Sequence, residues 1–186
     1  MILKTTCKSK NGHDIIIRPA ESKDAESLLK LKLQYLRNTK TIPLFEDEYK
    51  NSVKEETALI DMLLKEKNSC LFVAENEGQL IGNLDIKGNQ RRKLIHTGML
   101  GMGVAEKWQG LGIGSLLIRE AIKWIDENEL LEIVWLEVYD SNYPAKILYR
   151  KMGFQECGRI KEFFKENGQL IDNISMVYHS YQSSKL

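Results

Sequence analysis

The chain has 186 residues, of which 42% are hydrophobic and 28% charged, and its formal net charge is +1. This length and composition are typical of one globular domain with a buried core. A charge so close to zero argues against nucleic acid as a partner, and no apolar run is long enough to span a bilayer. We expect a single cytoplasmic domain over residues 1–186 that binds neither nucleic acid nor membranes, with residues 1–12 and 180–186 peripheral to it.

The cysteines and the N-terminal residues give no sign of export or of a metal centre. Cys7, Cys70 and Cys157 are scattered, odd in number and not arranged as a CxxC pair. We expect free thiols in a reducing compartment rather than disulfides or a zinc site. The first residues have no long apolar core and no small-residue cleavage site, so we expect no secretory signal.

The first half of the chain predicts a strand, two helices and a hairpin. Residues 14–18 are a β-rich run that ends at Pro19, and Ser22 and Asp24 are suited to cap the helix that follows. Residues 70–75 and 80–87 are β-rich and joined by a short turn with glycine, which is typical of a hairpin. The expected buried helix faces consist of Ala25, Leu29, Leu33 and Leu36 in the first helix and Val53, Ile60, Leu63 and Leu64 in the second.

The second half alternates strands and helices and ends in another hairpin. Residues 93–105 form a long strand-like run, and residues 132–138 are almost continuously apolar, as in a strand buried on both faces. The helix between these runs has an apolar face, and residues 142–154 predict a short helix ended by glycine. Residues 159–178 predict a hairpin around Asn-Gly, and the whole order indicates a mixed sheet covered by helices. The apolar face of the helix consists of Leu117, Ala121, Trp124 and Ile125, the short helix ends at Gly153, and the hairpin turns at Asn167 and Gly168.

Residues 109–117, QGLGIGSLL, place three glycines at alternate positions directly before a helix. A helix N-terminus carries free N–H groups and about half a positive charge, and glycines let an anion reach them. This favours a phosphate or pyrophosphate ligand. The P-loop requires Gly-Lys-Ser/Thr and the dinucleotide fingerprint requires GxGxxG, so neither motif matches.

The same segment resembles the acyl-CoA pyrophosphate loop of the GNAT superfamily of N-acetyltransferases, whose pattern is Q/R-x-x-G-x-G/A. Gln109, Gly112 and Gly114 occupy the fixed positions. Residues 142–154 resemble the second signature of the superfamily, N-x-x-A-x-x-L-Y-x-x-x-G-F, and the close match extends over residues 94–178. The matching positions of the second signature are Asn142, Ala145, Leu148, Tyr149, Gly153 and Phe154.

The resemblance implies an α/β (α+β) GNAT fold. This fold has a mixed, mostly antiparallel sheet of about six to seven strands, splayed between the fourth and fifth strands and flanked by about four helices. The fourth strand is then the run that ends at Val104, and the fifth comprises residues 132–138. Gly103 is expected to form a bulge that opens the splay. The resemblance also implies acetyl-CoA as cosubstrate, bound in this splay, and no metal.

The implied acetyl-CoA site is built mainly from backbone. Main-chain groups of Met102, Gly103 and Val104 are expected to bind the pantetheine arm. Asn142 is expected to contact the same arm, to cap its own helix, or to do both. Gln109 stands where many relatives have arginine, and Lys107 is the candidate replacement for that charge. The residues expected at the pyrophosphate are Gln109, Gly110, Leu111, Gly112, Ile113, Gly114 and Ser115.

The implied catalytic groups are a proton donor and a base. Tyr149 is expected to donate to the departing thiolate, and so to contact the cosubstrate, with a core tyrosine as the alternative. Its ordinary pKa of about 10 exceeds that of a thiol, about 8.5, so full proton transfer is uphill by about 2 kcal/mol. A backbone N–H near Val104 is expected to hold the oxyanion. Glu137 and His96 are the candidate bases, each with a purely structural role as the alternative.

The acceptor is less specified than the cosubstrate. Two functions stay open: an active N-acetyltransferase, and a GNAT-fold module that binds or senses acyl-CoA without catalysis. For the enzyme, the acceptor is a small amine, a metabolite or drug, or a protein N-terminus. We expect residues 38–50 and the last hairpin to shape the acceptor side. That hairpin is also expected to support a homodimer through an edge strand.

Overall fold

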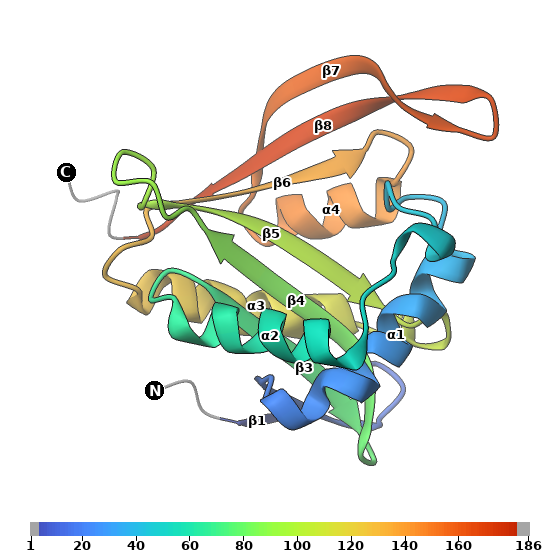
Figure 1. Ribbon diagram of the computed structural model, residues 1–186. Coiled ribbons are helices and arrows are strands. Elements are labelled where there is room, and N and C mark those ends of the chain that lie inside the picture. The colour runs from blue at the N-terminus through green and yellow to red at the C-terminus, as the bar shows by residue number, and fades with distance from the viewer. Residues whose placement is uncertain (1–3, 182–186) are drawn as a thin grey trace.

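The computed structural model describes residues 4–181, and Figure 1 shows their eight strands as one open sheet in the order β1-β2-β3-β4-β5-β6-β8-β7. Neighbouring strands run antiparallel except β5 and β6, which pair in parallel. The mixed, mostly antiparallel sheet is therefore confirmed. The strands are β1 Thr5–Lys8, β2 Asp14–Pro19, β3 Cys70–Asn76, β4 Gln79–Gly88, β5 Thr97–Val104, β6 Ile133–Tyr139, β7 Gln155–Glu166 and β8 Gln169–His179.

Four α-helices cover the two faces of the sheet. The helices α1 (Ala25–Asn38) and α2 (Val53–Lys65) pack on one face against Leu71 and Val73 of β3. The helices α3 (Ile113–Glu127) and α4 (Tyr143–Lys151) cover the other face, over the larger apolar core. Three short 3₁₀ segments, Ser22–Asp24, Glu46–Glu48 and Glu106–Trp108, complete the connections. Within residues 4–181, no helix is long and apolar enough to cross a membrane.

The buried face of α1 differs from the expected one. Leu28 and Leu31 are buried, whereas Leu29 and Leu33 are only half-buried. The buried side of α1 also contains Lys32, whose ammonium group donates a hydrogen bond of 2.9 Å to a buried carboxylate on α2. Ala25 and Leu36 are buried as predicted, so the prediction was wrong for the middle of the helix, where counting apolar residues passes over a buried lysine.

The same ion pair explains the error in α2. Glu56 is fully buried and accepts the hydrogen bond from Lys32, while Val53 and Leu64, which were expected inside, are 44% and 48% exposed. Ile60 and Leu63 are buried as predicted. The buried side of α2 therefore includes Glu56, whereas Val53 and Leu64 lie outside it.

Two strands depart from the expected bounds. The strand expected over residues 93–105 begins only at Thr97, because Leu94 and the residues before it form a turn whose carbonyl groups bond back to the chain. Residues Thr5–Lys8, in the segment expected to be peripheral, pair with β2 as an additional edge strand. At the other end Ser180 is buried, and residues 182–186 lie outside the described part.

The splay between β5 and β6, the fourth and fifth strands of the family pattern, is confirmed. The two strands pair only from Thr97 to Met99, although β5 continues to Val104 and β6 to Tyr139. Beyond the last pair they diverge and leave one edge of β5 without a strand partner. The prediction of a bulge at Gly103 was wrong for the edge of β5 that pairs with β4, because the register runs through this residue without a shift. A Cβ atom here would lie 2.3 Å from the ring of Tyr35 on α1, so close packing requires the glycine.

Candidate active site

The glycine stretch forms a tight loop at the open end of β5, which we call the cradle. Gly110 and Gly112 have φ of 74° and 89°, in the left-handed region, which reverses the chain and starts α3 at Ile113. Gly112 is the N-cap, and no side chain caps the helix. The first-turn N–H groups of α3 are therefore not capped by a side chain, a geometry that suits an anionic ligand.

Gly114 has a different role from the two glycines before it. A Cβ atom at Gly114 would lie 3.0 Å from Leu148 Cδ2 and 3.4 Å from Met102 Cε. The glycine therefore lets α3 approach β5 and α4 closely. This packing places the start of α3 next to Leu148, the residue before Tyr149, so that the cradle and α4 meet at the open end of β5.

The turn between β1 and β2 packs against the cradle. The backbone N–H of Lys10 donates a hydrogen bond of 3.0 Å to the carbonyl of Leu111, and the ring of His13 meets that of Trp108 at 5.2 Å. The aliphatic part of the Lys10 side chain lies 3.5 Å from the position of a Cβ atom at Gly112. An exposed lysine from a distant segment therefore lies along the cradle.

Gln109 faces back into its own loop rather than outward. Its side-chain Nε2 donates a hydrogen bond of 3.1 Å to the carbonyl of Val104. The amide thus holds the end of β5 against the loop and contributes no charge. Lys107 is exposed in the preceding 3₁₀ segment, so Lys10 and Lys107 both lie in or beside this loop.

Tyr149 and Asn142 lie at the two ends of α4. Tyr149 is 7% exposed and packs against Phe154, with the ring centres 5.7 Å apart. Burial raises the pKa of its phenol to about 12, and none of the described residues hydrogen-bonds its hydroxyl. Asn142 Oδ1 accepts a hydrogen bond of 3.3 Å from the N–H of Ala145, so this residue is the N-cap. Its amide nitrogen is left as a donor for a ligand.

The two candidate bases lie at opposite ends of the β5–β6 pair. Glu137 follows the last paired residue of β6 by two positions, and its chain neighbours Leu136 and Val138 are buried on the α3/α4 face. By alternation, the exposed Glu137 side chain points to the α1/α2 face at the open end. His96 precedes β5 at the closed end, where its carbonyl accepts N–H bonds from the start of β6. The structure therefore brings Glu137, but not His96, to the cradle end.

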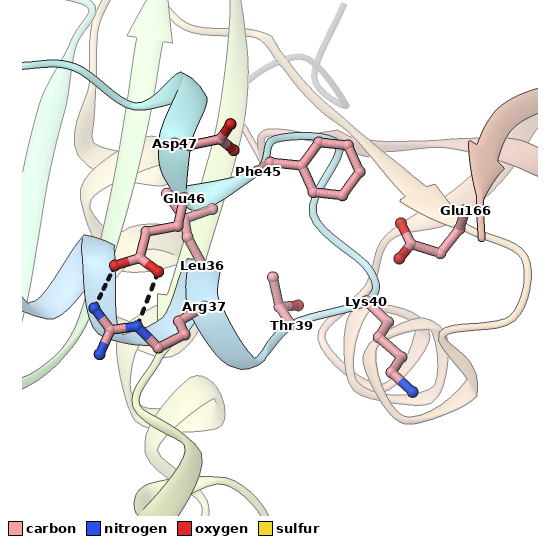
Figure 2. A pocket seen from close by; sticks show the side chains of 8 residues that line it. All are labelled: Leu36, Arg37, Thr39, Lys40, Phe45, Glu46, Asp47 and Glu166. Atoms are coloured by element: carbon pink, nitrogen blue, oxygen red, sulfur yellow. Dashed lines mark hydrogen bonds and ion pairs between the residues drawn. The ribbon is translucent and has the colours of Figure 1, made fainter.

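A pocket of about 350 Å³ opens beside this end of the sheet (Figure 2). It lies between the C-terminal end of α1, the segment that follows, and the tip of the β7–β8 hairpin. Arg37 pairs with Glu46 across the pocket wall. Tyr35, which covers Gly103, comes directly before Leu36, the first lining residue. The lining residues are Leu36, Arg37, Thr39, Lys40, Phe45, Glu46, Asp47 and Glu166.

A sequence model of the acetyltransferase (GNAT) family matches residues 28–154, which is more than half of the chain. The chain belongs to this family. The acetyltransferase is 29% identical over 161 residues to the L-amino acid N-acetyltransferase AaaT of Escherichia coli, covering 86% of this chain and 94% of the relative. It is 27% identical over 169 residues to an N-alpha-acetyltransferase of Sulfurisphaera tokodaii, covering 86% and 91% of the two chains.

A solved structure supports the same conclusion. The acetyltransferase of the GNAT family from Streptococcus pneumoniae superimposes with a TM-score of 0.86 at 28% identity, covering 89% of this chain and 99% of that one. The fold and the family together show that the protein is an acetyl-CoA-dependent N-acetyltransferase. Among residues 4–181, no group of three or more His, Cys, Asp or Glu side chains is placed to hold a metal ion.

The open end of β5 has two features that suit acetyl-CoA. The first turn of α3 has no side-chain cap, and the diverging strands leave β5 beyond Met99 without a strand partner on the β6 side, where only the Val104 carbonyl is bonded, to Gln109. A pantetheine arm has amide groups that such a strand edge can bind. The observed geometry thus suits both ends of acetyl-CoA.

Three residues around this site gave no signal that sequence reasoning could use. Lys10 lies far from the cradle in sequence, and Tyr35 and Asp85 sit in segments expected to be purely structural. The alternating Gly101 and Gly103 of β5 are the available signal, since they imply that larger groups cover that face. The structure identifies these groups: a Cβ atom at Gly101 would lie 3.4 Å from Asp85 Oδ1, and Tyr35 covers Gly103.

Proposed function

We propose that the enzyme transfers the acetyl group of acetyl-CoA to an α-amino group, by direct attack within a ternary complex. The observations that carry this proposal are the exposed Glu137 on β6, beyond the last β5–β6 pair, and the close packing of Leu148, the residue before Tyr149, on the start of α3. The names of two relatives support the acceptor class, because an L-amino acid N-acetyltransferase and an N-alpha-acetyltransferase both act on α-amines.

The pKa of the acceptor supports the same class. An α-amine, with a pKa of about 7.7 to 8.0, costs about 1 kcal/mol to present in neutral form at pH 7. A lysine side chain, with a pKa of about 10.4, costs about 4.6 kcal/mol. A single carboxylate such as Glu137 therefore has a much smaller free-energy cost to overcome with an α-amine than with a lysine side chain.

For the cosubstrate, we propose recognition mainly by main-chain groups. The N–H groups of residues 111–115 bind the pyrophosphate, the β5 edge from Met102 to Val104 binds the pantetheine arm, and the Asn142 amide donates to the same arm. Lys10 supplies the positive charge that Gln109 does not. The support is the uncapped start of α3 and the lysine stem along Gly112.

In the proposed reaction Glu137 takes a proton from the acceptor ammonium, and the freed lone pair attacks the thioester carbon. The developing oxyanion accepts a hydrogen bond from a β5 N–H near Val104. The nitrogen then releases its second proton to water, the C–S bond breaks, and Tyr149 donates a hydrogen bond to the leaving sulfur. Because the Tyr149 pKa is raised to about 12, the phenol keeps its proton, and the thiolate is protonated by solvent. His96 has no part in this scheme.

A panel of amines tests the proposal by release of the CoA thiol. We expect turnover with L-amino acids or with peptides that have a free N-terminus. Peptides with a blocked N-terminus and a free lysine side chain should give no turnover. Acetylation of the lysine side chain alone would contradict the α-amine proposal. Tight acetyl-CoA binding with no acceptor at all would favour the sensing module instead.

Pairing of two copies through the outer strand stays a prediction, as does the cytoplasmic location. The strand β7 ends the sheet, and three large apolar side chains of the last hairpin, Ile160, Phe163 and Leu170, are about half exposed. Exposed edge strands of this kind favour edge-to-edge contact. Light scattering at high protein concentration should give the mass of a dimer, and a clean monomer would contradict the pairing.

A further inference from the structure

A row of three residues crosses the sheet at its open end. Asp85 of β4 pairs with Gly101 of β5, and the parallel register of β5 with β6, in which Met99 pairs with Trp135, brings Glu137 into line with Gly101 if continued. Both carboxylates are on the α1/α2 side of their strands, and Gly101 has no side chain. Asp85 therefore lies beside Gly101, and Glu137 is on the other side of the split where β5 and β6 part.

The Asp85 carboxylate is close to Gly101. A Cβ atom at Gly101 would lie 3.4 Å from its Oδ1 and 3.5 Å from its Oδ2, so the carboxylate covers the glycine. The Asp85 side chain is only 18% exposed. Lys87 Nζ lies 3.8 Å away, which is beyond hydrogen-bond distance.

Two buried carboxylates elsewhere in the fold have closer cationic partners than Asp85 has. Asp24 accepts a hydrogen bond of 2.9 Å from Arg18, and Glu56 accepts one of 2.9 Å from Lys32. Such partners lower the pKa of both carboxyls, whereas burial raises the pKa of Asp85 above its ordinary value. The ion pair of Asp85 with Lys87 at 3.8 Å does not offset the cost of burial, and carboxyls whose pKa is raised in this way are found more often at functional sites.

We propose that Asp85 and Glu137 form a two-carboxylate acceptor subsite that admits the α-ammonium of a peptide N-terminus and disfavours free amino acids. This inference rests on the proposed α-amine acetylation. Asp85 binds the acceptor as an ammonium ion, and Glu137 then removes its proton. Asp85 is thus a specificity-determining residue, because its negative charge repels a carboxylate next to the amine but not a neutral group there.

The substituent beside the amine separates the two acceptor classes. In a free amino acid a carboxylate stands one carbon from the amine, so binding places it in the field of both carboxylates, where like charges repel. In a peptide this group is a neutral amide. In the pocket beside the end of α1, Glu46 and Arg37 neutralise each other, and Asp47 and Glu166 stand against Lys40. The pocket therefore has a small excess of negative charge.

The test compares L-alanine with the amide of tri-L-alanine, two acceptors that share the same N-terminal residue. We expect wild-type kcat/KM to favour the peptide amide. The Asp85→Asn variant should reduce this preference at least tenfold by raising KM for the peptide and lowering it for alanine. The ratio between the two proteins cancels the difference in α-amine pKa of the acceptors. Glu77→Gln, which removes an exposed carboxylate from the β3–β4 turn, is the matched control and should keep the wild-type preference.

The outcomes separate this inference from the proposed function. An unchanged preference in Asp85→Asn, or a wild-type enzyme that uses alanine as well as the peptide, overturns the subsite but leaves α-amine acetylation intact. Failure of the wild-type enzyme to acetylate any α-amine overturns the proposed function itself, and the subsite with it.

A stability measurement tells a functional Asp85 from a structural one. The titratable groups around Asp85 are Lys87 on β4, Cys70 on β3, Lys32 and Tyr35 on α1, Tyr49 before α2 and Glu56 on α2. Burial raises the Asp85 pKa despite the two lysines. Folding then disfavours the ionised form, so the wild type loses stability as pH rises through the folded-state pKa. Asp85→Asn should therefore melt at a higher temperature than wild type at pH 7.5, with a gap that closes toward acid pH. A lower melting temperature at pH 7.5 would make Asp85 a structural residue and overturn the proposal.

Discussion

The cosubstrate end and the acceptor end of this enzyme are built in opposite ways. The cosubstrate end uses one continuous stretch of chain, from the end of β5 to the first turn of α3, and offers mostly backbone groups. The acceptor side draws side chains from α1, β4, β6 and the last hairpin, which meet only through the register of the sheet. A backbone site suits a cosubstrate common to the whole family, whereas a side-chain site can change with the acceptor.

The largest effect that we predict falls on the acceptor side, at Glu137. Glu137→Gln removes the proposed base but keeps size and polarity, and general-base catalysis is typically worth about 10²- to 10⁴-fold. We expect kcat to fall about 500-fold, with KM for acetyl-CoA unchanged. Glu132→Gln, another exposed glutamate just before β6, is the control. A wild-type kcat in the Glu137 variant would assign the base elsewhere.

Tyr149 tests whether the reaction needs a donor at the sulfur. Tyr149→Phe keeps the packing on Phe154 and removes only the hydroxyl, so kcat should fall about a hundredfold while KM for acetyl-CoA moves less than about threefold. Because burial raises the Tyr149 pKa to about 12, the wild-type enzyme should show no loss of rate from this group up to about pH 10. The exposed Tyr143, changed to Phe, is the control. A variant with wild-type kcat would leave Tyr149 as a packing residue.

Gly112 tests the backbone character of the cosubstrate end. Gly112→Val strains a residue with φ of 89° and places a side chain at the cradle. We expect acetyl-CoA to bind at least tenfold more weakly by calorimetry, about 1.4 kcal/mol, with KM for the acceptor unchanged. Gly78→Val introduces the same strain at φ of 80° in a distant turn and should leave the affinity alone. Equal affinity in a folded Gly112 variant would remove the loop from its proposed role.

The smallest effect is expected at Lys10, the one side-chain charge proposed for the cosubstrate end. An exposed ionic contact is worth about 0.5 to 1 kcal/mol, so Lys10→Met should weaken acetyl-CoA binding about two- to fivefold, less at high salt. Lys8→Met is the control, because Lys8 lies in the same hairpin and pairs with Asp14 at 2.7 Å. Equal loss in both variants would indicate general charge rather than a contact.

The two ends also differ in how well they can be predicted from the sequence, because one is built from backbone groups and the other from side chains. Backbone recognition needs glycines and a helix start close together in sequence, so residues 109–115 and the signature around Asn142 and Tyr149 could be found without a structure. The Asn167-Gly168 hairpin and most strands were equally accessible, because turns and alternation are local. The splay between β5 and β6 followed from the family resemblance.

The acceptor side could not be predicted in this way. Whether Asp85 faces solvent or the splay depends on which helices cover that face, and nothing in residues 80–87 encodes that. The buried pair of Lys32 and Glu56 misled the prediction of both helix faces, because its members are individually polar. The approach of Lys10 to Gly112 depends on the additional strand β1, which no sequence pattern indicated.

The most direct test of a backbone-built cosubstrate end is a titration with CoA followed by amide NMR chemical shifts. We expect the largest changes at the amides of residues 111–115 and of Met102 and Val104. Changes should be small across α2, which packs on the acceptor face of the sheet. Large changes confined to side-chain amides or to the acceptor face, with the amides of residues 111–115 unmoved, would contradict the account.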